Sequence, residues 1–468
     1  GACGVSGSES ILAEERLQTN HESKAAIVSG SSDYASFLAR KAKHVPPAGK
    51  RVVDAEINGT LHEWQRDIVR WACDRGRAAV FADCGLGKTF MQLEWARLMH
   101  DRGALIVAPL SVARQTVREA RKLGIDVTYT RNTPDGNGGM WITNYEMLDH
   151  IDPARFDAVV LDESSILKNY VGKMRSQIID QFRSTPFRLA CTATPAPNDV
   201  AELTNHAEFL GVSTRQEMLG AYFITNMDNK SDGGGYRVKG HAKHPMFRWM
   251  AQWAAAVRTP ADLGYPADAY ELPPLTVHPE IVDVEIQPDG QLFATDLGGV
   301  GGRAAVRRET LAARVDRAVE LATGTDDQWI LWAGLNDEAE ALAARIPDAV
   351  NVDGSWTPDA KAESLEAFQD GRVRVLITKP SIAGFGMNFQ NAHRMAFVGI
   401  GDSYEAYYQS IRRCYRFGQQ HPVSVHIVVS ELEQQIALNV ARKERTTSEA
   451  TDLLVKYQTV TTKKEIAV

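Results

Sequence analysis

The stretch RAAVFADCGLGKT, residues 77–89, decides the fold class of this chain. Its first six residues are mostly small or apolar, which is typical of a buried strand, and the apolar-rich segment 90–99 that follows has the composition of a helix. Between them lies a turn with two glycines that ends in Lys88 and Thr89. Glycines let backbone N–H groups curl around phosphate oxygens, and the N-terminus of the helix adds a positive dipole. This order of elements predicts a phosphate-binding loop, with Ala82 in the place of the usual first glycine.

Outward from this loop, short apolar strands alternate with longer helical segments in two parts of the chain. The expected strands lie at 77–82, 104–109, 140–145, 157–162, 187–194, 328–334, 348–354, 373–379, 394–399 and 423–429. Such alternation is typical of parallel α/β sheets, whose binding loops lie at the carboxyl ends of the strands. The rhythm stops between about 211 and 270, where a Trp-rich helical stretch, FRWMAQWAAAV, precedes a proline-rich segment.

This pattern predicts an α/β protein with two units. We expect a flexible leader at 1–46, a first unit at 47–270 with an insert at about 211–260, a linker at 271–280 and a second unit at 281–468.

Composition limits the ways in which the chain could bind a charged partner. Its 468 residues include 52 Lys and Arg against 59 Asp and Glu, a net charge of −7, and 44% of them are apolar. These values exclude a disordered chain and a protein that holds nucleic acid by bulk charge, so such a partner would need local basic groups. The scattered cysteines encode no disulfide framework or zinc ribbon. There is no long apolar run or signal-peptide pattern, so we expect a cytoplasmic protein with no membrane partner.

An acid pair, Asp162-Glu163, closes another apolar strand and completes the predicted phosphate site. Lys88 would reach the β and γ phosphates of ATP, and the Thr89 hydroxyl would ligate Mg²⁺. Asp162 would hold the same ion through water, and Glu163 would orient or deprotonate the attacking water. The alternative is a solvated acid pair at the start of a helix.

The segment SYEAYYQSIRRCYRFGQQ, 403–420, supplies arginines in the second unit. It is predicted as one helix with Asp402 or Ser403 as its N-cap. On such a helix Gln409, Arg413 and Arg416 share a face. Arginines that project from one unit toward a phosphate site on the other would act as fingers on the transferring γ-phosphoryl group. The alternative is a surface charge cluster.

These segments together resemble the motor core of superfamily 2 helicases and translocases, most closely the Swi/Snf-like branch and its compact phage and bacterial relatives. The resemblance covers about residues 47–447. It is carried by the motifs ADCGLGKT (82–89), DESSILKN (162–169), TATPAPND (192–199), TKPSIAGFGMNFQNA (378–392) and QSIRRCYRFGQ (409–419). It implies two RecA-like lobes in tandem with an ATP cleft between them. The chain departs from the pattern in two motifs. In the motif at 162–169, Ser165 replaces the usual His. In the motif at 409–419, Arg412 replaces the usual Asp and Tyr415 replaces the usual His.

The resemblance also implies roles for individual residues. Gln65 would read the adenine, and Thr192 and Thr194 would couple hydrolysis to domain movement. The further nucleotide contacts would come from Gly85, Gly87, Gly386 and Gln409. The contacts to a nucleic-acid strand would come from Ser111, Arg114, Thr143, Asn144, Lys379, Ser381 and Asn388.

The function expected from the resemblance is an ATP-dependent translocase or helicase that moves along duplex DNA, in the cytoplasm of a bacterial or phage-infected cell. Two alternatives stay open. One is an ATPase subunit that works only with a partner protein in a replication or defence complex, and the other is an RNA helicase. Gln419, where RNA-unwinding relatives commonly place Arg, argues against the last. The insert YRVKGHAKHPMFRW, 236–249, would either contact nucleic acid or pack on its own lobe through its aromatic residues.

Overall fold

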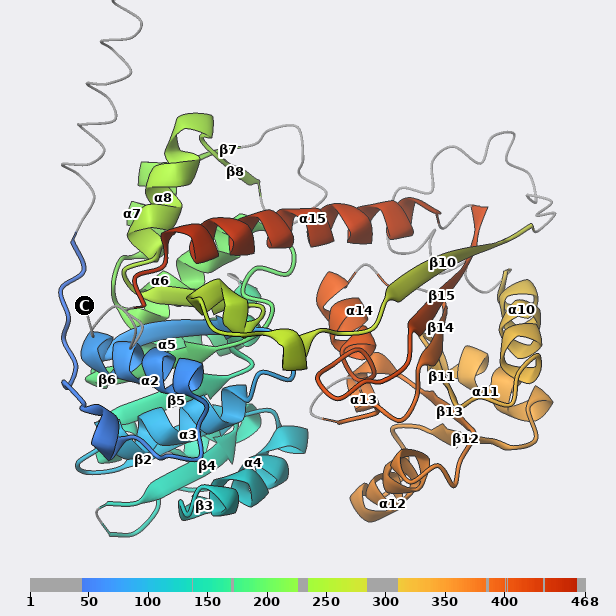
Figure 1. The fold of residues 1–468 in the computed structure, drawn as a ribbon, viewed down its shortest axis with the longest axis horizontal. Helices are drawn as coiled ribbons and strands as arrows, with labels where there is room; N and C mark the ends of the chain where they lie inside the picture. The colour runs from blue at the N-terminus through green and yellow to red at the C-terminus, as the bar shows by residue number, and fades with distance from the viewer. Residues whose placement is uncertain are drawn as a thin grey trace, which may run out of the picture.

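The computed structural model describes residues 44–460, apart from 137, 170–171, 226–234, 284–309, 384–386, 400, 402 and 432–433. Within these ranges the chain forms two lobes, each built on a parallel sheet, with a long helix lying across them (Figure 1). The expected leader lies outside the described residues except for its last three, of which Val45 packs on the first lobe. No helix in the described ranges is long and apolar enough to span a bilayer.

The first lobe is a seven-stranded parallel sheet with the order β3-β4-β2-β5-β6-β1-β9. Its strands are β1 (Arg77–Ala82), β2 (Ala104–Ala108), β3 (Val127–Tyr129), β4 (Met140–Asn144), β5 (Ala158–Asp162), β6 (Phe187–Cys191) and β9 (Ala254–Val257). Its helices are α2 (Glu63–Arg75), α3 (Lys88–Met99), α4 (Leu110–Lys122), α5 (Lys173–Gln181), α6 (Leu203–Leu210), α7 (Arg215–Tyr222) and α8 (Lys243–Met250).

Helices cover both faces of this sheet, which explains why its strands are apolar at nearly every position. In β1, Ala78 and Val80 face the core beneath α2 and α3, while Ala79 and Phe81 face the core beneath α6 and α8. Every strand neighbour pairs in parallel. The carboxyl ends of β1, β2, β5 and β6 therefore meet at one edge, which faces the second lobe in Figure 1.

The second lobe is a six-stranded parallel sheet with the order β10-β15-β14-β11-β13-β12. Its strands are β10 (Leu275–Val282), β11 (Trp329–Ala333), β12 (Ala349–Val352), β13 (Val375–Thr378), β14 (Arg394–Val398) and β15 (Val423–Ser430). Its helices are α10 (Leu311–Thr323), α11 (Asn336–Arg345), α12 (Pro358–Gln369), α13 (Pro380–Ala383) and α14 (Tyr404–Ile411). Two sheets of this kind in tandem confirm the predicted fold class, two RecA-like lobes.

Three boundaries differ from those expected. The stretch AAAV, predicted as helix within the insert, is strand β9, because its small buried residues let it pair with β1 at the edge of the first sheet. Most of the expected linker at 271–280 belongs to β10, which pairs with β15 from Leu275 onward. The connector between the sheets therefore ends at about Pro274.

The C-terminal helix α15 (Gln434–Tyr457) is the third difference, because its second half does not belong to the lobe in which it was placed. Val440 joins the core of the second lobe, whereas Ala450 and Leu454 join the core of the first. Lys243 on α8 also pairs with Glu449 at 2.8 Å. One helix thus connects the two lobes (Figure 1).

The basic and aromatic insert packs on its own lobe. Strands β7 (Phe223–Thr225) and β8 (Tyr236–Val238) form a short antiparallel pair. Phe247 and Trp249 on α8 are buried in the core of the first lobe, and the Arg248 guanidinium lies 5.2 Å from the Tyr457 ring centroid. Its aromatic side chains at 247 and 249 are therefore used for packing, not displayed for stacking on bases.

Candidate active site between the two lobes

The loop between β1 and α3 has the backbone geometry that a phosphate cradle needs. Gly85 and Gly87 have φ values of 87° and 69°, which side chains rarely tolerate. A Cβ at Gly87 would lie 2.5 Å from Nε2 of Gln65, and one at Gly85 would lie 3.1 Å from the backbone nitrogen of Phe417. The first contact is within the first lobe and the second crosses to the other lobe. Both glycines are therefore required by the fit of their neighbours as well as by backbone conformation.

Gln65 supports this loop directly. Its side-chain amide donates to the Leu86 carbonyl at 2.9 Å and accepts from the His62 backbone N–H at 2.9 Å, at the start of α2. The side chain is buried. Gln65 therefore ties the loop to the start of α2. Its expected role in reading adenine remains a prediction.

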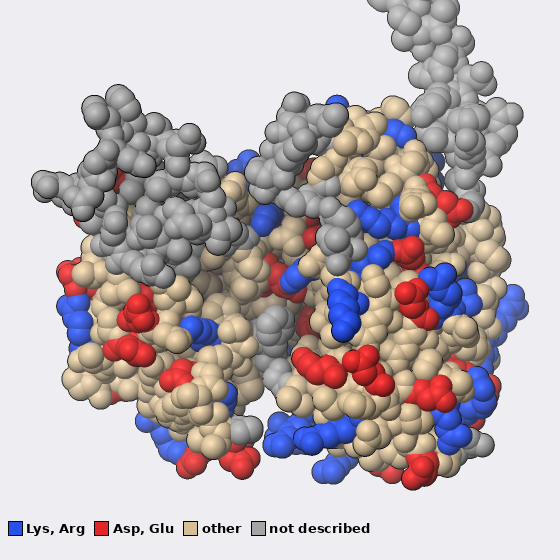
Figure 2. All heavy atoms as spheres, turned by 180° about the vertical axis from the view of Figure 1, so that it is seen from behind, with Lys and Arg blue, Asp and Glu red and all other residues tan. Residues whose placement is uncertain are grey.

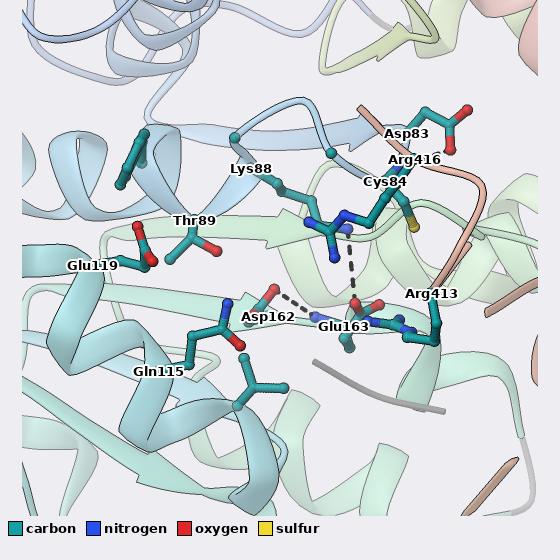
Figure 3. Close-up of a pocket in the computed structure, with 14 residues that line it drawn as sticks. Asp83, Cys84, Lys88, Thr89, Gln115, Glu119, Asp162, Glu163, Arg413 and Arg416 are labelled. Carbon is teal, nitrogen blue, oxygen red and sulfur yellow. Dashed lines mark hydrogen bonds and ion pairs between the residues drawn. The ribbon is translucent and has the colours of Figure 1, made fainter. Parts of the chain in front are cut away.

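A cavity of about 240 Å³ opens in front of the loop and is walled by both lobes (Figure 3). The first lobe contributes the loop, Thr89 and the acid pair, and the second contributes Arg413 and Arg416. Lys88 Nζ lies 3.8 Å from Glu163 Oε1. The residues expected to bind the phosphates, hold the metal and act as fingers therefore share one pocket.

Burial and neighbouring charges set the protonation of the groups in this pocket. Burial opposes the charge on Lys88, but Glu163 and Asp162 outweigh it and raise the pKa of Lys88, so the ammonium persists. Burial, reinforced by the charge on Glu163, raises the pKa of Asp162 to about 6. Asp162 Oδ1 also accepts from Gln92 Nε2 at 2.7 Å, which orients the carboxylate. A divalent cation beside Asp162 would offset the repulsion between the Asp162 and Glu163 carboxylates.

Glu163 adopts a backbone conformation that marks functional sites. Its φ of 53° is the one positive value among the non-glycine residues that the structure describes. Its carboxylate accepts from Thr192 Oγ1 at 3.4 Å, and Thr192 Oγ1 in turn accepts from the Thr194 N–H at 3.1 Å. Of the two residues expected to couple hydrolysis to movement, Thr192 thus contacts the acid directly, and Thr194 is linked to it through Thr192.

A histidine from elsewhere in the chain lies close to the position that Ser165 fills in the motif. His206 on α6 lies 3.1 Å from Ser164 Oγ through its Nε2. Burial lowers the pKa of His206 to about 4, so this imidazole is neutral near pH 7. The sequence did not single out this residue, because no local pattern links α6 to the acid pair.

The arginine segment is not the single helix that was predicted over 403–420. Ser403 is the N-cap, and its hydroxyl accepts from the Ala406 N–H at 3.2 Å, but α14 ends at Ile411. Arg413 lies in the turn that follows, where its backbone carbonyl accepts from the Phe389 N–H at 2.8 Å. Pairing with the neighbouring loop therefore replaces helical hydrogen bonds. Arg413 and Arg416, the expected fingers, enter the pocket from a turn, not from one face of a helix.

Hydrogen bonds hold Arg413 in place. Arg413 donates to the side-chain oxygen of Gln409 at 2.6 Å and to the Met387 carbonyl at 3.1 Å. Arg416 donates to the same carbonyl at 3.4 Å. The buried Nε2 of Gln409 has no acceptor among the described residues, so a donor is left beside the pocket. Gly386, expected nearby, lies outside the described residues.

Gln419 has a structural role in this turn. Its side-chain nitrogen lies within 3.1 Å of three backbone carbonyls, and its oxygen accepts from the N–H groups of Gln420 and His421 at 2.9 Å. The side chain is therefore fully engaged within its own lobe.

The residues expected to contact a nucleic-acid strand fall into two groups. Thr143 and Asn144 are buried, and their side chains bond to the Thr130 carbonyl at 2.8 Å and to the Tyr129 hydroxyl at 2.7 Å. These two side chains are therefore not presented to a strand. Arg114 and Ser381 are exposed, and Lys379 and Asn388 are partly so. The side chain of Ser111 is not described.

The pocket also contains residues that sequence patterns did not reveal. Gln115 and Glu119 project into it from one face of α4, toward Thr89 and Asp162 (Figure 3). Asp83 and Cys84 line it from the loop. The spacing of Gln115 and Glu119 on a helix was the available signal, but nothing in the sequence indicates which face of α4 meets the phosphate loop.

The residues present fit a Mg²⁺ nucleoside triphosphate. A glycine cradle, a charged lysine, a hydroxyl beside a carboxylate and two arginines across the cleft are the groups that bind and neutralise such a ligand. Fold and site together define the class, a tandem RecA-like core with a nucleotide site between its lobes.

Comparisons with known proteins find similarity to helicases and to Swi/Snf-related proteins. Residues 314–418 match the helicase conserved C-terminal domain family. The SWI/SNF-related matrix-associated actin-dependent regulator of chromatin subfamily A-like protein 1 of Xenopus tropicalis is 21% identical over 419 residues, which cover 83% of this chain and 44% of that protein. The chain thus spans less than half the length of this relative. These matches confirm the resemblance to superfamily 2 helicases and translocases of the Swi/Snf-like type.

Two solved structures are similar to the chain in outline. The Sulfolobus solfataricus SWI2/SNF2 ATPase core in complex with dsDNA is 17% identical, with a TM-score of 0.40, over 86% of this chain and 96% of that one. Saccharomyces cerevisiae Dbp5 bound to RNA and ADP BeF3 is 15% identical, with a TM-score of 0.47. This match covers 81% of this chain and 89% of that one.

Proposed function

We propose that this protein hydrolyses ATP between its two lobes, with Mg²⁺, and uses the cycle to move along duplex DNA. One observation carries the proposal: Lys88 and the acid pair of the first lobe line the same cavity as Arg413 and Arg416 of the second. A site that needs both lobes is complete only when they are together. Hydrolysis and release would therefore alternate with closing and opening of the cleft.

Each residue has a chemical task in this scheme. Lys88 and the loop N–H groups bind the phosphates, and Thr89 and Asp162 hold the cation that neutralises them. Glu163 orients and deprotonates the attacking water. Arg413 and Arg416 stabilise charge on the transferring group, an effect of about 10³–10⁵ in rate for such fingers. Mg²⁺ supplies further charge neutralisation when bound.

Duplex DNA is the polymer that the resemblance favours. The matched Xenopus protein is named for chromatin regulation, which supports DNA over RNA. On the face shown in Figure 2, Lys and Arg are interspersed with Asp and Glu and form no broad basic field. With a net charge of −7, the chain would bind a backbone through few cations, Arg114 and Lys379 among them, together with hydroxyls and N–H groups. Affinity would be modest and would fall with salt.

The test is steady-state ATPase activity of the full chain with no nucleic acid, duplex DNA, single-stranded DNA and RNA. We expect duplex DNA to stimulate turnover most and Lys88→Ala to abolish it. Stimulation by RNA alone would favour an RNA helicase instead. Negligible turnover under all four conditions, restored by a partner protein, would favour an ATPase subunit of a larger complex.

A further inference from the structure

The phosphate loop carries a carboxylate that the proposed function does not use. Asp83 precedes the glycines and lines the same cavity as Lys88. Its Oδ1 accepts from the Cys84 N–H at 2.6 Å and from the Tyr408 hydroxyl. A negative charge on this loop would repel the phosphates of a bound nucleotide even though the carboxylate points away from Lys88 (Figure 3), because partial burial would limit screening by solvent.

The second lobe pairs this carboxylate with one positively charged residue, Arg412. Arg412 Nη2 lies 2.7 Å from Asp83 Oδ2, and the exposed fractions of the two side chains are 18% and 14%. The guanidinium is also held between aromatic rings, 5.1 Å from the Tyr408 centroid and 5.3 Å from the Tyr415 centroid. Both rings belong to the second lobe, so Arg412 is oriented before it meets the loop.

Arg412 differs in position from its two arginine neighbours. Arg413 and Arg416 line the nucleotide cavity, whereas Arg412 lines a separate cavity of about 200 Å³ on the other side of Asp83, next to α15. Arg412 is therefore not a third finger. It acts on the nucleotide through Asp83, and it occupies the motif position where the resemblance leads one to expect an acid.

We propose that Arg412 is a positioning residue that neutralises Asp83, so that the loop binds a nucleoside triphosphate with full affinity only when the second lobe is docked. The proposal rests on the proposed ATP site. It makes nucleotide affinity depend on lobe closure through one charge pair, in addition to the fingers. Removing Asp83 should remove the need for Arg412.

An ion pair that only held the two lobes together would give a different result from charge compensation. Lys168 of the first lobe and Glu405 of the second form another ion pair across the lobes, outside the nucleotide cavity. If Arg412 only held the lobes together, loss of either member of its pair would weaken binding equally, and the double variant would be no better. Charge compensation instead predicts that the loss of Asp83 rescues the loss of Arg412.

The experiment is an equilibrium titration of the full chain with a fluorescent ATP analogue and Mg²⁺. We expect Arg412→Ala to raise Kd about tenfold, Asp83→Asn to leave it unchanged or lower it, and the double variant to return within about threefold of wild type. Lys168→Ala, which breaks the other pair, serves as the matched control and should bind normally. Arg412→Lys, which keeps the charge, should bind more tightly than Arg412→Ala.

Outcomes separate this inference from the proposed function. A wild-type chain that binds no nucleotide would overturn the proposed ATP site. If wild type binds but Arg412→Ala binds equally well, or the double variant is as weak as Arg412→Ala, charge compensation is wrong. If Arg412→Ala fails to fold, Asp83→Asn still decides: weaker binding by this variant contradicts compensation, and unchanged or tighter binding supports it.

Discussion

Glu163 Oε1 lies 3.8 Å from Lys88 Nζ, so the acid and the phosphate-binding lysine already form an ion pair. In the proposed mechanism, a nucleotide would compete with Glu163 for the lysine, and that competition would free the carboxylate to act on water. The pair would thus link phosphate binding to activation of the proposed base.

Glu163→Gln should therefore bind ATP at least as tightly as wild type and hydrolyse it at least about 100-fold more slowly, because the amide cannot accept a proton. Nucleotide titration together with single-turnover hydrolysis measures both effects. Lys88→Ala provides the contrast, since it should lose binding as well. Near-normal turnover by Glu163→Gln would show that another group is the base.

Thr192→Val should slow hydrolysis about tenfold without changing nucleotide affinity. The variant removes the hydroxyl that donates to Glu163 Oε2 at 3.4 Å, a hydrogen bond to a charged group. Comparison of kcat and Kd for the variant and wild type is the measurement, with Thr192→Ser as the control that keeps the hydroxyl. A Thr192→Ser variant as slow as Thr192→Val would assign the effect to packing.

Gln115→Ala should raise the Mg²⁺ concentration needed for half-maximal nucleotide binding by about threefold to tenfold. Its amide projects toward Thr89 and Asp162, the residues that would hold the cation, and polar groups around metal ligands tune metal affinity (Figure 3). A Mg²⁺ titration of fluorescent ATP analogue binding measures this. Gln216→Ala, an exposed glutamine on α7, makes the same chemical change outside the pocket and should have no effect.

Glu202→Gln should stabilise the protein in alkaline but not in acidic solution. Burial raises the pKa of Glu202 to about 7, although hydrogen bonds from Asn198 oppose the shift. A raised folded-state pKa gives stability that is present below the unfolded value of about 4.5 and is lost as the pH rises through 7. We expect the variant to exceed wild type by about 1–2 kcal/mol at pH 8, seen as a higher Tm that converges with wild type toward pH 4.5. An equal Tm difference at both values would contradict this.

The sequence predicted the parts of the fold that local chemistry determines. Both glycines of the loop, the lysine and the acid pair follow from strand, turn and helix signals, because each motif is contiguous in the chain. The helix predicted over 403–420 begins as expected but ends at Ile411, because Arg413 pairs its backbone with Phe389, a contact that no local pattern encodes. Strand β9 was missed because an alanine-rich stretch suits a helix as well as a sheet edge.

Long-range contacts explain the remaining surprises at the site. Asp83 and Arg412 are 329 positions apart, and only the docking of the lobes brings them together. The motif comparison marked Arg412 as a departure from the pattern but gave it no partner. Thr143 and Asn144 show the converse, since residues in an expected strand-contact motif are used here for hydrogen bonds inside the lobe.

Displacement of a third strand from a triplex tests the central claim most directly, because a motor that moves along duplex DNA strips the third strand without separating the duplex. We expect the wild-type chain to displace it with ATP and Mg²⁺, and Lys88→Ala to leave it in place. No displacement by a wild-type chain whose ATPase responds to duplex DNA would contradict translocation.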